Sequence, residues 1–143
     1  MEYTADTWPR DRWPNFSFEE FSCSHSGACI MNPEFMDRLQ DLRDEMGPLH
    51  ITSGYRSLTH PNEIKKDRPG AHTHGRACDI AMYGEPAYSI VGRAENHGFT
   101  GIGIQQRSDV PHHKRFIHLD DLEDDIFHGE LNTLFSNRTN IER

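Results

Sequence analysis

Residues 69–82, PGAHTHGRACDIAM, place two histidines, a cysteine and an aspartate within one short run. From residue 77 onward the run alternates, which predicts a strand with Cys78 facing the apolar core and Asp79 facing the opposite side. Gly75 lets the backbone bend between the histidines and this strand. Composition alone does not decide which of His72, His74 and Asp79 carries out chemistry.

Three further strands are predicted around this one. Residues 49–53 form a short strand that runs into a turn at Ser53 and Gly54, and residues 101–106, GIGIQQ, form a glycine-rich strand. In the last strand, RFIHLD at 115–120, alternation separates two apolar side chains from three on the opposite face. The first set is Ile117 and Leu119, and the second is Phe116, His118 and Asp120.

The clearest helix of the chain begins after Asn32, a preferred N-cap residue, with Pro33 at its first position and Gly47 at its end. Its apolar residues recur at three- and four-residue spacing and form one stripe: Phe35, Met36, Leu39, Leu42 and Met46. A second helix lies between Pro86 and Gly98. Because helices and strands follow one another without a regular βαβ alternation, we expect an α+β fold with a small antiparallel sheet flanked by helices.

The length of 143 residues fits one domain, 1–143. Residues 1–15 are predicted to form an extended lead-in that docks its tryptophans on the body, and Ser17 and Glu20 match a capping box that starts a short helix. Residues 59–71 are expected to be a polar loop. Residues 121–143 are predicted to form a C-terminal helical tail whose apolar residues pack back on the domain: Phe127, Leu131, Leu134 and Phe135.

Charge and composition exclude several classes of function. The net charge of −8 argues against binding to nucleic acid or to anionic lipid, both of which need a basic surface. No apolar run approaches the roughly 20 residues that span a bilayer. The N-terminus does not resemble a signal peptide, so we expect synthesis in a cytoplasm and reduced thiols, with a Cys23–Cys29 loop disulfide as the alternative.

Three residues in this pattern have the chemistry of a zinc site. His72 lies on a loop, Asp79 on the adjoining strand, and His118 on the polar face of a later strand. Two imidazoles and a carboxylate, with a fourth position for water, are the arrangement that catalytic zinc uses. The alternative is a solvated loop in which Asp79 is a residue of the strand edge. A second site at Cys23, His25 and Cys29 lacks a convincing fourth ligand.

Three segments also resemble those of a known superfamily. HTHGRACD at 72–79 matches H-x-x-G-x-A-x-D, ITSGYRS at 51–57 resembles an S-G-Y-R-S segment, and FIHLD at 116–120 resembles F-x-H-x-D. All three are typical of the zinc D-alanyl-D-alanine peptidases, which cut the stem peptides of peptidoglycan and have a fold related to the hedgehog signalling domain. The resemblance runs from about Phe16 to Asp120, in the same order.

The resemblance implies one zinc ion bound by His72, Asp79 and His118, and it places Arg56 where the superfamily has an arginine that binds substrate and stabilises the transition state. The acid or histidine that relatives carry before the last zinc ligand is missing, since Arg115 and Phe116 stand there. Asp120 is therefore predicted either to be the general base or to orient a zinc ligand.

Other positions near these segments are secondary candidates. Ser53, Tyr55 and His74 are expected to contact substrate, with packing in the core as the alternative for Tyr55 and exposure to solvent as the alternative for His74. Gly70 departs from the superfamily, which usually has serine at that position.

The expected function is therefore hydrolysis of an amide bond in the peptide of peptidoglycan by a monomeric zinc peptidase. A phage endolysin, made in the host cytoplasm and released to act on the wall, is the expected role. The alternative is a domain that keeps the zinc ion and has lost catalysis, as a wall-binding module or a structural part of a phage tail. The sequence leaves open which peptide bond is cut.

Overall fold

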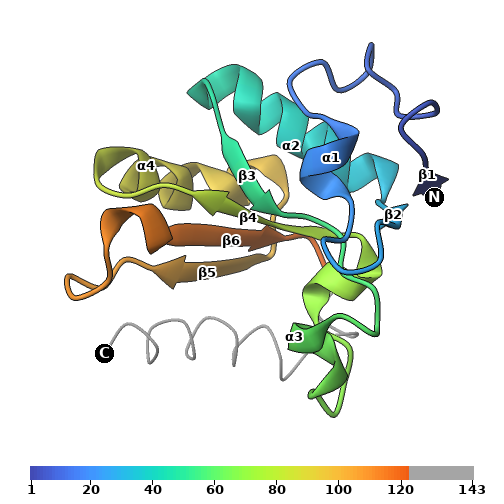
Figure 1. Cartoon of the computed structure of the whole chain (residues 1–143). Coiled ribbons are helices and arrows are strands. Elements are labelled where there is room, and N and C mark those ends of the chain that lie inside the picture. Colours follow the sequence, from blue (N-terminus) through green and yellow to red (C-terminus); the bar gives the residue numbers. More distant parts are fainter. Residues whose placement is uncertain (123–143) are drawn as a thin grey trace.

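The computed structural model describes residues 1–122 of the chain (Figure 1). The predicted C-terminal helix, with Phe127 and Leu131, lies outside the described residues. The elements in chain order are β1 (Glu2–Tyr3), α1 (Phe18–Phe21), β2 (Cys29–Ile30), α2 (Pro33–Met46), β3 (His50–Ser53), α3 (Pro61–Ile64), the 3-10 turn η1 (Ala71–His74), β4 (Ala77–Ala81), α4 (Glu85–Ala94), η2 (Glu95–His97), β5 (Gly101–Gln105), η3 (His112–Lys114) and β6 (Phe116–Asp120).

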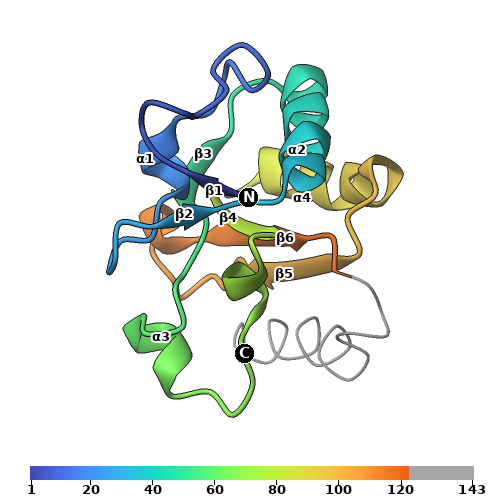
Figure 2. The ribbon, with the colours of Figure 1, turned by 90° about the vertical axis from the view of Figure 1, so that its right-hand side faces the viewer.

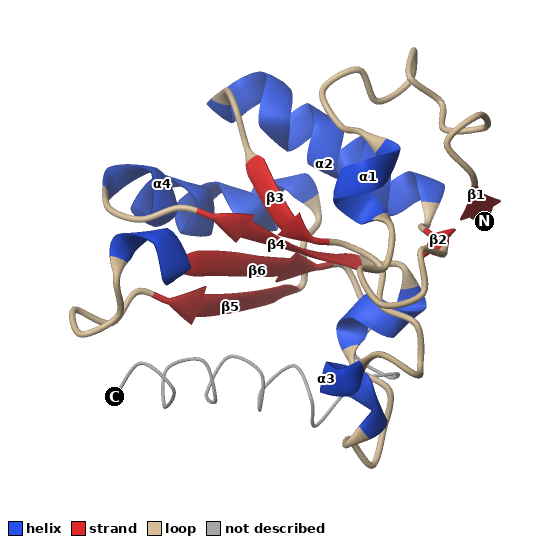
Figure 3. Ribbon diagram, viewed as in Figure 1, coloured by secondary structure: helices blue, strands red, loops and turns tan. Residues whose placement is uncertain are grey.

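The predicted α+β class with a small antiparallel sheet is confirmed. The main sheet has four strands in the order β3-β4-β6-β5, with every neighbouring pair antiparallel (Figure 3). Strands β4 and β6 lie at its centre, and their register places Asp79 directly opposite His118 and Ala77 opposite Asp120. Strands β1 and β2 form a separate two-stranded ribbon.

Helices α2 and α4 lie together on one side of this sheet (Figure 2). Asn32 caps α2 by accepting a hydrogen bond from the backbone N–H of Phe35, as its position predicts. The apolar stripe of α2 packs against the apolar face of the sheet, so that the core holds Phe35, Met36, Leu39, Leu42, Cys78, Ile80, Ile90, Ile117 and Leu119. Within residues 1–122, no helix combines the length and hydropathy needed to cross a bilayer.

The N-terminal lead-in docks its aromatic side chains as expected, but it is not extended. Trp8 and Trp13 are buried, and their rings meet edge to face with centroids 5.1 Å apart. Hydrogen bonds from Trp8 N–H to Thr4 O and from Trp13 N–H to Pro9 O fold the segment into turns. The prediction of an extended segment was wrong because both indoles reach the same part of the core only if the chain folds back between them.

Two local predictions, the capping box at Ser17 and the polar loop at 59–71, had different outcomes. The capping box of Ser17 and Glu20 is present in both directions at the start of α1. The polar loop at 59–71, however, contains helix α3 and the start of η1. His60 caps α3, and the side chain of Glu63 turns inward and is buried. The polar character of this segment therefore did not indicate that one of its carboxylates is buried.

Candidate metal centre

Three predicted ligands come together on the polar face of the sheet. His72 lies on η1, Asp79 on β4 and His118 on β6, and one ligand atom from each lies within 4.8 Å of the others. Asp79 and His118 share a face because they are cross-strand partners. Gly75, with a positive φ of 67°, turns the chain from η1 into β4; it also passes so close to the Ile30 carbonyl that a Cβ would collide.

The orientation of His72 leaves one ring nitrogen available to a cation. Its Nδ1–H donates to the Gly54 carbonyl at 2.7 Å, which fixes the tautomer with the lone pair on Nε2. Gly54 itself packs against α1, where a Cβ would lie 2.6 Å from the Phe21 Cα, so a larger residue does not fit at this position. Nε2 is buried, accepts no hydrogen bond from residues 1–122, and lies 3.3 Å from Asp79 Oδ1.

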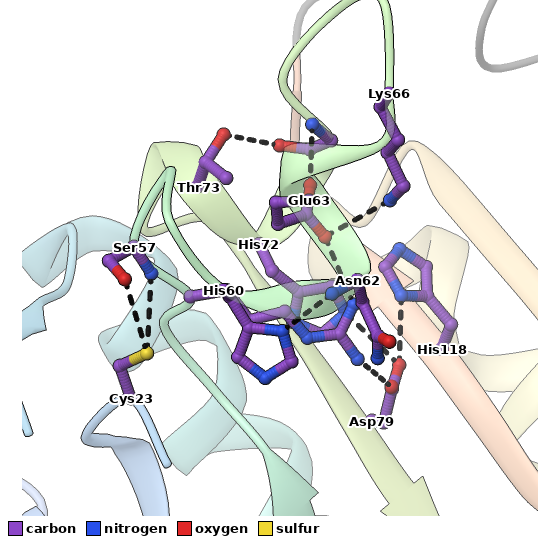
Figure 4. Close-up of polar contacts among 12 residues, drawn as sticks. Cys23, Ser57, His60, Asn62, Glu63, Lys66, His72, Thr73, Asp79 and His118 are labelled. Carbon is purple, nitrogen blue, oxygen red and sulfur yellow. Dashed lines mark hydrogen bonds and ion pairs between the residues drawn. The ribbon is translucent and has the colours of Figure 1, made fainter. Parts of the chain in front are cut away.

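His118 lies between two carboxylates. Its Nδ1 is 2.9 Å from Asp79 Oδ1, and its Nε2 is 2.9 Å from Asp120 Oδ2 (Figure 4 shows the contact with Asp79). The two ring nitrogens thus face opposite ways, Nδ1 towards Asp79 and Nε2 towards Asp120. His118 and Asp120 have 1% and 0% of their surface exposed, so this chain of contacts is closed to bulk water.

The charge states of Asp79 and His72 suit a cation, whereas the two carboxylates beside His118 favour its protonated form. Burial raises the pKa of the Asp79 carboxyl, but His72 and His118 together have the larger effect and lower it to well below its usual value. Burial lowers the pKa of His72. For His118, burial lowers the pKa, but Asp120 and Asp79 raise it above its usual value. An ionised carboxylate beside a neutral imidazole with an unused lone pair is a donor set that fits zinc.

Arg56 approaches the same group from the loop after β3. Its backbone N–H donates to the His72 carbonyl at 3.2 Å, and its Nη2 lies 3.6 Å from Asp79 Oδ2. Its Nη1 lies 3.2 Å from Glu63 Oε2. With 17% of its side chain exposed, the guanidinium lies at the boundary between this buried group and solvent.

Glu63 is the residue that the sequence analysis missed. Its carboxylate contacts Arg56, Lys66 at 3.0 Å and the backbone N–H of Gly70 at 2.9 Å (Figure 4). The stretch around it, HPNEIKKDRPG, reads as a solvated loop, and no local signal separates Glu63 from its charged neighbours. Its pairing with Arg56 depends on the tertiary structure.

The residues expected to contact substrate, Ser53, Tyr55 and His74, do not all lie at one place. Ser53, Tyr55 and Arg56 line one side of a hollow of about 380 Å³ beside β3. Tyr55 is also largely buried, with burial raising the pKa of its hydroxyl, so it packs in the core as well. His74, at the end of η1, is exposed.

Within residues 1–122, the cysteines belong to no group of side chains placed to hold a metal. Cys23, Cys29 and Cys78 are all buried free thiols. Burial raises the pKa of the Cys23 thiol, but hydrogen bonds from Ser57 and Ser26 lower it to about 6, whereas burial raises that of Cys29 to about 12. In the part of the chain that the structure describes, the group of three around Asp79 is the one set of side chains arranged to hold a metal.

Two comparisons with known proteins agree with this geometry. The sequence profile of the family described as Peptidase M15 matches residues 14–120. A zinc D-Ala-D-Ala carboxypeptidase of Streptomyces albus G is 32% identical over 69 residues, which are 47% of this chain and 27% of that protein. The chain therefore matches about a quarter of the length of this relative.

Proposed function

This chain belongs to the M15 peptidase family, and from this premise we propose that it is a zinc metallopeptidase that hydrolyses an amide bond in the peptide part of peptidoglycan. The observation that carries the proposal is the buried Nε2 of His72, which has no hydrogen bond within residues 1–122 and faces Asp79 and His118. The substrate class is supported by the name of the Streptomyces relative, a D-Ala-D-Ala carboxypeptidase.

The ligands of the single zinc ion would be His72 through Nε2, Asp79 through its carboxylate and His118 through Nδ1. When bound, zinc polarises the scissile carbonyl and lowers the pKa of a water molecule towards about 7. Arg56 would bind a carboxylate or a developing negative oxygen of the substrate, since a guanidinium makes directed, charge-assisted hydrogen bonds. Ser53 and Tyr55 would line the path of the peptide towards Arg56.

Asp120 would orient His118 instead of acting as the general base. It contacts the ring nitrogen that faces away from Asp79, and it is completely buried. A carboxylate in this position fixes the imidazole and raises its basicity as a ligand. Arg115, at one of the positions where relatives carry an acid or histidine, donates to the Val110 carbonyl at 2.8 Å and is committed to its own loop.

The biological role that we propose is that of a monomeric phage endolysin acting on the cell wall after release from the host cytoplasm. The alternative is a zinc-containing wall-binding or tail domain without activity. That alternative is favoured by the side chains at 115 and 116, arginine and phenylalanine, neither of which can take a proton from water at neutral pH.

The test is digestion of purified peptidoglycan by the zinc-loaded protein, with the released fragments identified by mass spectrometry. Wild type is expected to release peptide fragments whose masses name the bond that is cut. His72→Ala is expected to release none, whereas His113→Ala, which removes an exposed histidine on η3, retains the activity. Zinc-loaded wild type that leaves the wall intact would overturn the peptidase proposal and support the inactive domain.

A further inference from the structure

The carboxylate of Glu63 is buried in the loop that precedes the metal centre. Only 1% of its side chain is exposed, although α3 lies at the surface of the domain. Oε2 receives Arg56 Nη1 at 3.2 Å and Lys66 Nζ at 3.0 Å, and Oε1 receives the Gly70 N–H at 2.9 Å. A buried carboxylate costs several kcal/mol unless it is paired in this way, so these contacts are a specific feature of the loop.

The electrostatic surroundings keep this carboxylate charged. Burial raises the pKa of Glu63, but Lys66, the Gly70 N–H and Arg56 lower it below its usual value. Glu63 is therefore an anion next to the guanidinium that approaches the metal centre.

Arg56 lies between two competing anions. Glu63 Oε2 is 3.2 Å from Nη1, and Asp79 Oδ2 is 3.6 Å from Nη2. An arginine held by Asp79 alone would close onto that carboxylate and compete with the zinc ion for its lone pairs. Glu63 draws the guanidinium the other way, so that Asp79 remains a metal ligand and Arg56 remains free to meet a substrate oxygen.

Gly70 provides the space that Glu63 occupies. Its φ of −77° and ψ of 175° are open to any residue, so the backbone conformation does not require glycine. A Cβ at this position, however, would lie 2.6 Å from Glu63 Oε1 and 2.7 Å from Lys66 Nζ. A larger residue at position 70 would therefore displace the ends of these two side chains, of which Lys66 is exposed and free to move and Glu63 is buried.

We propose that Glu63 is a positioning residue that holds Arg56 off Asp79, and that Gly70 is the small residue that admits it. This inference rests on the proposed function only in its catalytic readout. Its effect on zinc binding follows from the competition at Asp79 and does not depend on which bond is cut.

The test uses the full chain and two measurements. Zinc affinity is measured by competition with a chromophoric chelator, and kcat and KM are measured with a soluble muropeptide that wild type cuts. Glu63→Gln keeps the shape of the side chain and removes its charge, so it is expected to weaken zinc binding and to lower kcat, each by about ten-fold. Glu45→Gln is the matched control, because it removes a carboxylate paired with Arg93 at 2.8 Å on the surface.

The decisive arm repeats Glu63→Gln in an Arg56→Ala background. If Glu63 acts through Arg56, the second substitution produces no further loss of zinc affinity, since no guanidinium is left to move onto Asp79. An equal ten-fold loss in both backgrounds would show that Glu63 only supports the loop, and would overturn the proposal. Unchanged zinc affinity in Glu63→Gln alone would overturn it as well.

Gly70→Ala supplies an independent arm. It is expected to lower zinc affinity like Glu63→Gln. In a Glu63→Ala background it is expected to have no further effect, because the carboxylate that the new Cβ would displace is gone and the exposed Lys66 side chain can move aside. A Gly70→Ala penalty that persists in the Glu63→Ala background would contradict the steric argument. If wild type cuts no muropeptide, the proposed function fails while the zinc measurements still decide the role of Glu63.

Discussion

The two faces of the central strands are equally buried and chemically opposite. On β6, Ile117 and Leu119 have no exposed surface, and on the other side of the same strand His118 and Asp120 have 1% and 0%. The apolar side chains pack beneath α2 and α4, where burial itself is favourable. The polar ones are stable in the interior only because each is paired with another polar group.

The neighbouring strand β5 accommodates this difference. Gly101 pairs with Asp120 and Gly103 with His118, so the polar side chains of β6 meet no side chain across the strand pair. A Cβ at Gly101 would collide with the Asp120 carboxylate. One face of this sheet therefore contributes mainly to stability, and the other mainly forms the candidate metal centre. Substitutions on each face should separate these two roles.

The largest effect is expected from His118→Ala on the polar face. Removing one of the three proposed protein ligands should abolish stoichiometric zinc binding and lower kcat/KM at least about a thousand-fold, roughly 4 kcal/mol in the activation free energy. Zinc per chain after desalting and the release of muropeptides measure both quantities. A variant that still binds one zinc ion per chain would show that His118 is not a ligand.

Ile117→Ala, one residue earlier on the same strand, should have the opposite profile. Removing a fully buried isoleucine costs about 2–5 kcal/mol of unfolding free energy, measured by urea denaturation. The folded protein should keep one zinc ion per chain and a kcat within about two-fold of wild type, since this side chain faces α2 and α4. Loss of zinc from folded Ile117→Ala would break the separation of the two faces.

Asp120→Asn has a smaller effect and decides between the two roles predicted for this carboxylate. If Asp120 orients His118, removing its charge should lower zinc affinity about 10- to 100-fold. As a general base, it would leave zinc affinity intact and lower kcat alone. Gly101→Ala displaces the same carboxylate and should repeat the zinc effect, which provides an independent check.

Much of this arrangement could be predicted because it is local. Alternation on β4 and β6 places Asp79 and His118 on the polar face, and one pattern of residues contains both Asp79 and His72. The cap of α2 at Asn32 and the capping box at Ser17 are equally local, and both are present.

What could not be predicted depends on contacts between distant segments. Glu63 stands in a polar run, and its burial requires Arg56 from the loop after β3 and the backbone of Gly70. Strand parity places Asp120 on the same face as His118 but gives no ring geometry, so the ring nitrogen that Asp120 contacts could not be predicted. The turns within residues 1–15 depend on where the core receives Trp8 and Trp13.

The smallest predicted effect concerns Asn32, which uses different atoms to contact the helix over the apolar face and the turn beside the metal centre. Its side chain caps α2, the helix over the apolar face, while its backbone N–H donates to the Gly75 carbonyl at 2.8 Å, beside the turn that carries His72. Asn32→Ala removes only the first contact, so it should cost about 1 kcal/mol of unfolding free energy and leave zinc affinity unchanged. Asn32→Ser, which retains a capping oxygen, should recover most of that stability in urea denaturation. Weaker zinc binding in Asn32→Ala would mean that the N-terminus of α2 helps to hold η1 in place. The two faces would then be coupled through the contact of Asn32 with Gly75.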